Sequence, residues 1–500
     1  MNVLLVSIDS LGRHWLEPYG RRVEIPVEVP SMRRLADAGA QFERHWVGSL
    51  PCMPARREFL AGVIEFPWRP WGPLEPFDVS LAAAARAGGV RTALVTDHFH
   101  YWQYGGGGYH EDYDTWEFVR GHEYDAWRPG PLEPDGSLLR QILAPAEERR
   151  GYPNRRQYAR NVHGLEREED FFAPRVFSLA ADTVRALDGG EPWFVYVDSF
   201  DVHEPFHCPE PYASMFTDED PRDPGLVLWP EYGPASSLDE RQLAFVRAQF
   251  AGKLAMVDRW LGVLLDTLDE LRLWEETTVI VTSDHGHFLG EHGALGKPWV
   301  PVYDVLARTP LWLVQPDGPR GRRVEALTTA VDVYATVLDA LGVPSTGGPH
   351  SRSLLPLARG ETDAHRDAVL YGWFGGSVNV TDGRRTYFHP GRAGERVSAH
   401  STSFLGTHPP DAWFRRPPLP GAAESGAFLP YTDAPVWRYD GGAWPQAERP
   451  ELYDVEADPD QLDDLAGRGS PEEERLRGLL ARELALLDVP HAQLERLELA

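Results

Sequence analysis

Cysteine is scarce in this sequence, which carries only Cys52 and Cys208 among its 500 residues. Two cysteines do not make a disulfide framework, so the sequence excludes a small secreted scaffold held together by such bonds. The chain also lacks an apolar run long enough to cross a membrane. Its first residues show neither the charged nor the apolar region of a secretory signal, so we expect a cytoplasmic protein with reduced thiols.

Basic residues are also few compared with acidic ones. The chain has 49 basic against 76 acidic residues, which gives a formal net charge of −27. Long-range repulsion then acts against nucleic acid and against an anionic membrane surface, so we expect neither as a partner. An anionic substrate would have to be attracted by a local cluster of positive groups.

The order of elements favours an α/β fold. With 500 residues, the chain is long enough for one large domain and a smaller appendage. Apolar runs predict buried strands over residues 2–7, 90–95, 193–197, 277–282 and 311–314. Apolar periodicity predicts helices over residues 79–87, 174–187, 238–271 and 331–341. Strands that alternate with helices indicate a large, mostly parallel sheet sandwiched by helices.

Two further regions differ from this pattern. Residues 101–170 are rich in glycine, aromatic residues and charge without clear periodicity, so we interpret them as a flexible insertion. Beyond residue 375, short β-like runs mix with glycine and proline before a helical stretch over residues 472–487. We therefore predict a catalytic domain over residues 1–375 and a smaller α+β portion over residues 376–500.

Acidic and imidazole side chains follow four of the predicted strands. Asp9 follows the first, His98 and His100 the second, His203 the third, and Asp284 with His285 the fourth, as read in sequence order. Ligands bind beyond the carboxyl ends of the strands in such sheets. Asp9, Asp284 and His285, together with an oxygen nucleophile, would suit a hard divalent cation. Each carboxylate taken alone is better explained as a helix or turn cap, and only their shared location favours a metal site.

A cysteine and two arginines stand at the start of a predicted helix. Residues 52–56 read Cys-Met-Pro-Ala-Arg, and a helical run follows. The start of a helix favours an anionic oxygen or sulfur, and the guanidinium of Arg56 suits a tetrahedral oxyanion. The alternative for Cys52 is a small buried hydrophobe. His203 is a candidate general acid because imidazole titrates near neutral pH, and Lys297 is a candidate partner for a substrate oxyanion.

These motifs resemble one family. The Cys-x-Pro-x-Arg pattern at residues 52–56, Thr-Ser-Asp-His-Gly at 282–286, Gly-Lys at 296–297 and Glu-Leu-Tyr-Asp at 451–454 resemble the type I, formylglycine-dependent sulfatases of the alkaline phosphatase superfamily. The resemblance extends from Asp9 to about residue 465. It implies an alkaline phosphatase-like fold and a sulfuric ester hydrolase that cleaves a small sulfate monoester.

The resemblance also implies a cofactor and a maturation partner. A formylglycine-generating enzyme would oxidise Cys52 to formylglycine (3-oxoalanine), whose metal-bound hydrate would attack sulfur. The resemblance implies one divalent cation, with calcium expected first and manganese second, and assigns its ligands to Asp9, the modified Cys52, Asp284 and His285. It further implies that Arg56 steadies the formylglycine, His100 contacts its hydrate, His203 protonates the leaving oxygen, and His98 and Lys297 bind the substrate.

Three departures from the family pattern keep alternatives open. Many sulfatases carry a second aspartate where this chain has Ser10, and often a lysine where it has His98. The pair Asp284-His285 also resembles phosphonate monoester and phosphodiester hydrolases, which share the formylglycine. The alternatives are therefore such a hydrolase on the same scaffold, or an inactive sulfatase-like protein that only binds sulfated ligands. The sequence does not identify the alcohol half of the substrate or the oligomeric state.

Overall fold

A large central sheet organises the fold. The computed structural model describes residues 1–103, 105–131, 136–143, 155–298, 301–406 and 420–499. Within these residues the largest sheet has eight strands, in the order β12 (Arg322–Thr329), β2 (Ala40–Trp46), β11 (Leu311–Val314), β8 (Thr277–Thr282), β1 (Asn2–Ile8), β6 (Trp193–Ser199), β4 (Arg91–Thr96) and β5 (Thr115–Phe118). β11 runs antiparallel to both neighbours, and the other pairs are parallel. The predicted mostly parallel sheet is confirmed.

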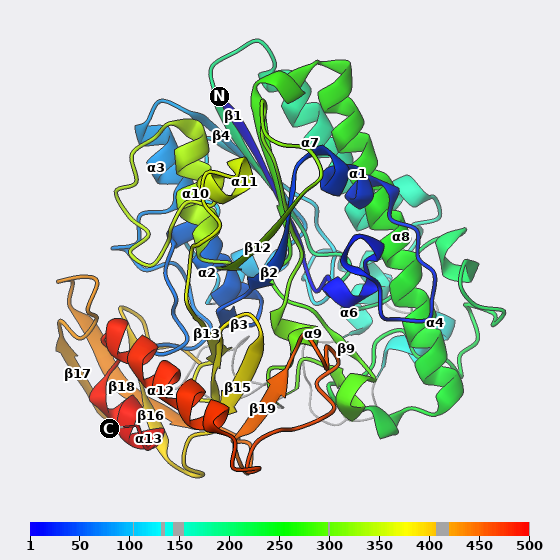
Figure 1. Ribbon diagram of the computed structural model, residues 1–500. Helices are drawn as coiled ribbons and strands as arrows, with labels where there is room; N and C mark the ends of the chain where they lie inside the picture. Colours follow the sequence, from blue (N-terminus) through cyan, green and yellow to red (C-terminus); the bar gives the residue numbers. More distant parts are fainter. Residues whose placement is uncertain (104, 132–135, 144–154, 299–300, 407–419, 500) are drawn as a thin grey trace.

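Helices cover both faces of this sheet, as Figure 1 shows. In β1, Val3 and Leu5 belong to one apolar cluster, and Leu4, Val6 and Ile8 belong to another. Successive side chains of a strand point to opposite faces, so a strand buried on both faces reads as one continuous apolar run. The first cluster includes residues of α2 (Cys52–Ala61), α3 (Leu81–Ala87), α10 (Asp332–Leu341) and α11 (Leu355–Arg359). The second includes residues of α1 (Pro30–Ala38), α7 (Phe172–Leu187) and α8 (Glu240–Glu270).

Some elements differ from the predictions. β2 and β12 at one side of the sheet were not predicted, because their sequences mix charged and apolar residues. The region interpreted as a flexible insertion contains β5, α4 (Gly136–Ile142) and α6 (Arg156–Asn161) in its described part. Aromatic side chains build this region, since Trp102 stacks on Phe118 at 3.8 Å between ring centroids. Residues 104, 132–135 and 144–154 of the predicted insertion lie outside the described residues.

Smaller sheets complete the chain. One sheet has the order β19 (Glu451–Asp454), β15 (Arg385–His389), β14 (Val378–Thr381), β13 (Val369–Trp373) and β3 (Ser49–Leu50). β16 (Arg396–Ser401), β18 (Val436–Ala443) and β17 (Ala423–Gly426) form another, and β7 (Gly233–Pro234), β10 (Ala294–Gly296) and β9 (Phe288–Leu289) a third. The remaining helices are α9 (Asp304–Ala307), α12 (Pro471–Leu486) and α13 (His491–Arg496). The smaller C-terminal sheet portion is thus confirmed.

The predicted domain division at residue 375 falls in the turn between β13 and β14. These two strands pair with each other, and β13 also pairs with β3 near the start of the chain. The C-terminal portion is therefore joined by hydrogen bonds to the segment that leads into α2. The division into residues 1–375 and 376–500 stays a prediction.

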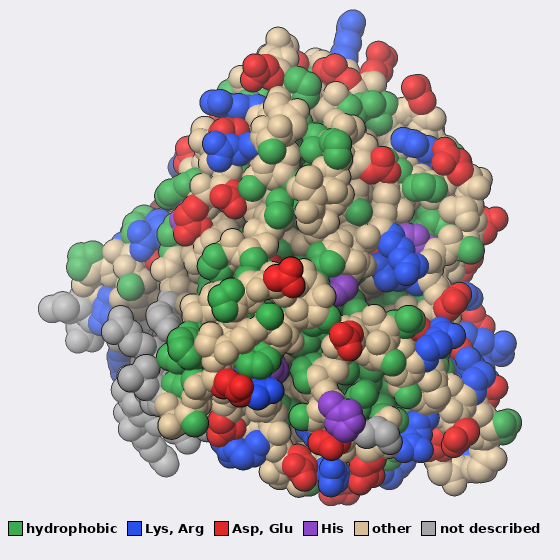
Figure 2. All heavy atoms as spheres, turned by 90° about the vertical axis from the view of Figure 1, so that its left-hand side faces the viewer, with side chains coloured by type: hydrophobic (Ala, Val, Ile, Leu, Met, Phe, Trp, Pro, Cys, Tyr) green, Lys and Arg blue, Asp and Glu red, His purple; other side chains and the backbone are tan. Residues whose placement is uncertain are grey.

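Charged side chains of both signs are intermixed on the face shown in Figure 2. Cys52 and Cys208 are both buried, and neither forms a disulfide in the described structure. Within the described ranges, no helix combines the length and the apolar character that crossing a bilayer requires.

Candidate active site

Cys52 is the first residue of α2 and is 2% exposed. The segment before it is held in two ways. β3 pairs with β13, and the backbone N–H groups of Gly48 and Ser49 donate to the carboxylate of Glu58 at 3.0 and 2.6 Å. Because Glu58 belongs to the second turn of α2, the segment that leads into the helix is tied to the helix itself. The Cys52 side chain is thereby placed at one defined point.

Arg56 lies one turn further along α2 and is fully buried among three carboxylates. Its Nε and Nη2 donate to the two oxygens of Asp198 at 2.9 and 2.8 Å. Nη2 also lies 3.0 Å from Asp9 Oδ2, and Nη1 lies 2.5 Å from Asp284 Oδ2. The planar guanidinium suits such multiple contacts, so Arg56 fixes the ends of three strands relative to α2.

The register of the sheet brings the two acidic candidates together. β1 and β8 are parallel neighbours in which Ser7 pairs with Thr282. Asp9 and Asp284 each stand two residues beyond this pair, so both follow the strands at the same edge. Donor atoms of Asp9, Cys52, Asp284 and His285 all lie within 4.8 Å of one another.

The tautomer of His285 fits a role as metal ligand. Its Nδ1–H donates to the carbonyl of Gly286 at 2.8 Å, which leaves the lone pair of Nε2 available. Nε2 lies 3.1 Å from Cys52 Sγ and 3.3 Å from Asp284 Oδ2. Asp9 Oδ2 is buried and, apart from its ion pair with Arg56, makes no hydrogen bond to any residue in the described ranges. Two carboxylates, an imidazole nitrogen and Cys52 therefore form a donor set that fits a divalent cation.

Ser10, which replaces the second aspartate of many sulfatases, orients both carboxylates. Its Oγ donates to Asp9 Oδ1 at 2.8 Å, and its backbone N–H donates to Asp284 Oδ1 at 3.1 Å. Its φ of 61° lies in the left-handed region that few residues other than glycine adopt. The site thus carries one negative charge fewer than the family pattern, and Ser10 acts through hydrogen bonds.

Burial and neighbouring charges shift the pKa values of Asp9, Asp284 and Cys52. Burial alone disfavours the ionised form of Asp9, but Arg56 and His98 hold its pKa well below the ordinary value. Burial and the neighbouring Asp9 raise the pKa of Asp284 well above the ordinary value. The same two causes raise the pKa of the Cys52 thiol. An unmodified Cys52 is therefore a neutral thiol and a poor nucleophile, contrary to the expectation that the helix start favours an anionic sulfur.

Lys297 lies beside Cys52 and also contacts His203. Lys297 Nζ is 3.8 Å from Cys52 Sγ and 2.7 Å from His203 Nε2. His203 Nδ1–H donates to the carbonyl of Glu204 at 2.8 Å, so Nε2 accepts from the Lys297 ammonium. Burial, reinforced by the charge of Lys297, lowers the pKa of His203 to about 3. His203 is therefore neutral near pH 7, whereas the Cys52 thiol group and Glu204 raise the pKa of Lys297, so the ammonium of Lys297 keeps its proton.

His98 and His100 occupy different surroundings. His98 Nε2 lies 3.6 Å from Asp9 Oδ2, and burial together with Arg56 lowers the pKa of His98 to about 4. His100 Nε2 lies 3.3 Å from Glu123 Oε2, and its ring centroid is 5.0 Å from that of His98. The structure thus brings all the predicted site residues to one edge of the sheet, while the roles given to them stay predictions.

Comparison with known proteins identifies the family. The family model described as Sulfatase matches residues 1–343. The chain belongs to the sulfatase family. Its relatives are sulfatases of the alkaline phosphatase superfamily, as the sequence resemblance indicated.

The sulfatase chain is similar to characterised proteins over most of its length. It is 26% identical to the multifunctional alkaline phosphatase superfamily protein PehA of Trinickia caryophylli, over 74% of this chain and 79% of that protein. It is 26% identical to a choline-sulfatase of Rhizobium meliloti (strain 1021), over 72% of each chain. Among solved structures, the phosphonate monoester hydrolase of Agrobacterium radiobacter shares its fold with a TM-score of 0.66 and 21% identity, covering 97% of this chain and 95% of that one.

Sequence reasoning missed two residues that hold this site. Asp198, the bidentate partner of Arg56, stands inside β6 opposite Ser7, whose Oγ donates to it at 2.6 Å. Lys253 is buried in α8, where it pairs with Asp201 and donates to the carbonyls of His203 and Pro205 at 2.9 Å each. The sequence did hold a signal for Lys253, because it is a charged residue within the apolar stripe of a predicted helix. The residues that contact Asp198 and Lys253 lie far away in the sequence, so these contacts are seen only in the folded structure.

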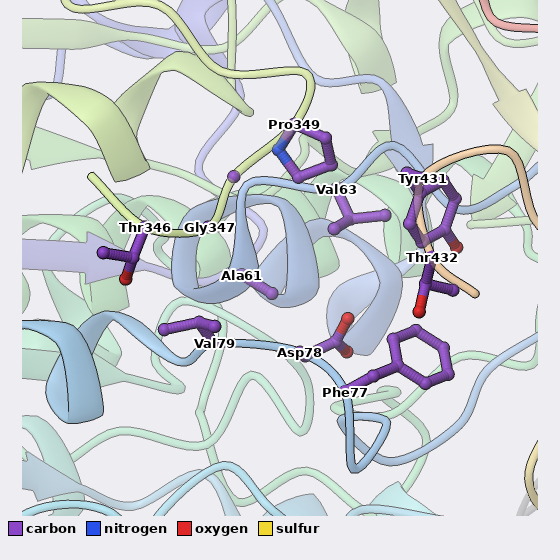
Figure 3. A pocket seen from close by; sticks show the side chains of 11 residues that line it. Ala61, Val63, Phe77, Asp78, Val79, Thr346, Gly347, Pro349, Tyr431 and Thr432 are labelled. Carbon is purple, nitrogen blue, oxygen red and sulfur yellow. The ribbon is translucent and has the colours of Figure 1, made fainter. Parts of the chain in front are cut away.

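A separate pocket of about 250 Å³ lies beyond the far end of α2, as Figure 3 shows. Its lining includes Ala61 from α2, Pro349 from the loop after α10, and Tyr431 from the C-terminal portion. The carboxylate of Asp78 also lines the pocket. It accepts hydrogen bonds from Nε and Nη2 of Arg57 at 2.8 and 2.9 Å. The pocket contains none of the predicted site residues, so it is distinct from the candidate active site.

The position of Arg56 predicts a large effect on stability. Arg56→Met would leave three buried carboxylates without their shared cation, so the free energy of unfolding should fall by about 3–5 kcal/mol. Urea denaturation of the two proteins measures the difference. Arg167→Met is the control, because Arg167 is exposed and pairs with Asp170 at the surface. Equal losses in the two variants would contradict the role given to Arg56.

Proposed function

We propose that this sulfatase-family protein hydrolyses sulfate monoesters with a formylglycine formed from Cys52. The observation that carries the proposal is the convergence of donor atoms from Asp9, Asp284 and His285 on the Cys52 side chain, with Lys297 Nζ 3.8 Å from Cys52 Sγ. The neutral thiol of unmodified Cys52 supports it, because a buried thiol far above its ordinary pKa cannot serve as the nucleophile.

The proposal includes a divalent cation held by Asp9, Cys52 after modification, Asp284 and His285. Calcium is our first candidate because carboxylate oxygens dominate the donor set, and manganese is second because His285 adds nitrogen. Such a cation would activate the nucleophile and neutralise negative charge on the transferred group. We also propose maturation by a formylglycine-generating enzyme and a cytoplasmic location.

The chain's own residues supply the remaining chemistry. Lys297, 3.8 Å from Cys52 Sγ, would bind an oxygen of the sulfate and favour the charge that develops there. His203 would protonate the departing alcohol through Nε2, which must first take up a proton from solvent because the neutral imidazole carries its proton at Nδ1. Lys253 holds the carbonyl of His203, so the position of this imidazole is fixed before substrate binds.

A phosphonate monoester or phosphodiester is the second candidate substrate. The Asp284-His285 pair favours it, as does the shared fold of a phosphonate monoester hydrolase. Sulfate monoesters, phosphonate monoesters and phosphodiesters are all tetrahedral monoanions at neutral pH. This charge arrangement would suit each of them, and the relative rates would then depend on how the group beside the reacting atom fits.

Conversion of Cys52 is the first expected outcome. Active protein should show the aldehyde mass in the peptide that contains Cys52, and Cys52→Ala should abolish hydrolysis of p-nitrophenyl sulfate without unfolding. Mass spectrometry and turnover on the same preparation make the measurement, with Cys208→Ala as the control because Cys208 lies outside the site. A fully active protein in which Cys52 remains an unmodified thiol would contradict the proposal.

The same assay decides between the two candidate substrates. We expect p-nitrophenyl sulfate to be turned over with a higher kcat/KM than p-nitrophenyl phenylphosphonate. The reverse order would assign the protein to phosphonate hydrolysis. An unmodified Cys52 or an empty metal site, together with no turnover of either ester, would favour a protein that only binds sulfated ligands.

Leaving-group dependence tests His203. An alkoxide is a poor leaving group and needs a proton, whereas an activated phenolate does not. His203→Ala should therefore slow alkyl sulfates by about 10²–10⁴-fold and activated aryl sulfates much less. The measurement is kcat/KM against the pKa of the leaving alcohol, with the exposed His163→Ala as control. A uniform loss across the series would show that His203 binds the sulfate or supports the fold.

A further inference from the structure

Lysine is rare in this chain, and both lysines lie beside His203. The sequence holds only Lys253 and Lys297, whereas arginine supplies all the other side chains counted as basic. Both lysines are buried. Lys297 donates to the ring nitrogen Nε2 of His203 at 2.7 Å, and Lys253 donates to the backbone carbonyl of the same residue at 2.9 Å. The ammonium of Lys253 therefore faces the segment that carries the imidazole rather than the imidazole itself.

The ammonium of Lys253 gathers three oxygen atoms from this segment. It forms an ion pair with the carboxylate of Asp201 and donates to the carbonyls of His203 and Pro205 at 2.9 Å each. An ammonium has three N–H donors, so these three oxygens satisfy it completely. An arginine carries its donors in a flat fork and would not match oxygens that surround a single nitrogen. One side chain of α8 thus holds residues 201–205 at three points.

Asp201 connects the segment to two further parts of the fold. Its Oδ1 also accepts from Nε2–H of His122 at 2.9 Å, and its Oδ2 accepts from the backbone N–H of Ala173, the second residue of α7, at 3.2 Å. Burial disfavours the ionised form of Asp201, but Lys253 and His122 hold its pKa below the ordinary value. The ionised carboxylate is therefore a fixed point between α7 and α8.

The same segment is bonded to the proposed cation site. The backbone N–H of Val202 donates to the carbonyl of Asp9 at 3.1 Å. Asp9 is one of the proposed ligands of the cation, so this bond ties the segment to the sheet edge. Lys253 holds the residues on either side of Val202. The place of the His203 imidazole relative to Asp9 therefore depends on the ammonium of Lys253.

A second metal ion does not fit this region. Donor atoms of Asp97, His122 and Asp201 lie within 4.8 Å of one another. The ammonium of Lys253 already contacts Asp201 and would repel a metal ion there. Nε2 of His122 carries the proton that it donates to Asp201, so it has no free lone pair. Burial and the charge of Asp201 raise the pKa of Asp97, which favours its neutral form. Lys253 is thus the cation of this cluster.

The stability of α8 gives little reason for a charge at this position. Lys253 lies among buried apolar residues of the same helix, including Phe250, Leu254 and Val257. Replacing a whole buried ion pair by well-packed apolar side chains is often neutral or stabilising, because the charges no longer lose their hydration. An apolar side chain would fill the space but could not hold the carbonyls of the segment.

We propose that Lys253 is a positioning residue for the proposed general acid, whose ammonium holds residues 201–205 so that Nε2 of His203 stays beside Lys297. This inference rests on the proposed function, because it takes His203 as the group that protonates the leaving oxygen. Lys253 acts through His203 and has no contact with the sulfate in this account. A displacement of about 1 Å at a reacting group can cost about 10²-fold in rate.

Leaving-group dependence in Lys253→Met tests the proposal on the full-length protein. Propyl sulfate needs a proton on its leaving oxygen and should lose about 10²-fold in kcat/KM, whereas p-nitrophenyl sulfate should lose much less. In the His203→Ala protein, adding Lys253→Met should cause no further loss for propyl sulfate, because the two residues act as one unit. Equal losses for both esters, or a full additional loss without His203, would overturn the inference.

A matched variant in the same helix separates positioning from destabilisation. Asp258 is also a buried charged residue of α8, but it accepts from the backbone N–H groups of Ser31 and Met32 at 3.0 and 2.9 Å. Asp258→Ala and Lys253→Met should both lower the midpoint of urea denaturation. Only Lys253→Met should change the ratio of the two rates. The same change of ratio in Asp258→Ala would assign the effect to lost stability and contradict the proposal.

A double variant guards against a fold too weak to assay. Lys253→Met alone leaves the carboxylate of Asp201 buried without its cation. Lys253→Met combined with Asp201→Asn removes that charge, so the protein should recover part of its stability. It should still lose propyl sulfate hydrolysis selectively, because the carbonyls of the segment remain unheld. Recovery of both stability and propyl sulfate hydrolysis would show that Lys253 serves only the fold.

Nuclear magnetic resonance of the histidine ring nitrogens tests the positioning without turnover. The signals of His203 are those absent from His203→Ala. The Nε2 resonance should move towards that of a free imidazole in Lys253→Met, because the 2.7 Å contact with Lys297 is lost, and should stay in place in Asp258→Ala. An unmoved resonance in Lys253→Met would overturn this inference and leave the sulfatase proposal standing. A moved resonance in a protein that hydrolyses no ester would support the positioning and contradict the proposed function.

Discussion

One guanidinium inserted among three buried carboxylates holds this structure together at its functional edge. Arg56 contacts Asp9, Asp198 and Asp284, which come from the ends of β1, β6 and β8. If all three carboxylates are ionised, they and the guanidinium carry a net charge of −2; a divalent cation would favour the ionised form of Asp284, whose pKa burial and Asp9 raise. Because unpaired buried charges are costly, the geometry of the sheet edge, the position of α2 and the affinity for a cation depend on one another.

The charges around this centre divide the site into two sides. Beside Cys52, Lys297 and the proposed cation suit the negative sulfate group. Next to His203, the carboxylates of Glu123 and Glu204 form a second, acidic cluster. The protein's overall charge of −27 offers no general attraction for an anion, so binding depends on this local arrangement. Such a division gives specificity through repulsion as well as attraction.

The sequence predicted the parts of the site that follow from local pattern. Asp9 and Asp284 stand directly after apolar strands, and the alternation of strands with helices placed them at one edge. Other parts depend on contacts between remote segments. β2 and β12 mix charged and apolar residues, and Asp198 stands within a buried strand. The carboxylate of Glu123 gains meaning only from His203 and Glu204, about 80 residues away in the chain. Burial also made His203 neutral, which no local pattern indicates.

The central claim is that Asp9, Cys52, Asp284 and His285 hold one divalent cation whose charge completes that of Arg56. Elemental analysis of the purified active protein tests it most directly. The account predicts one divalent ion per chain, removed together with activity by a chelator and absent from Asp284→Asn. Asp304→Asn, which alters a buried carboxylate outside the cluster, should retain the ion. A fully active protein without any bound divalent metal would contradict the account.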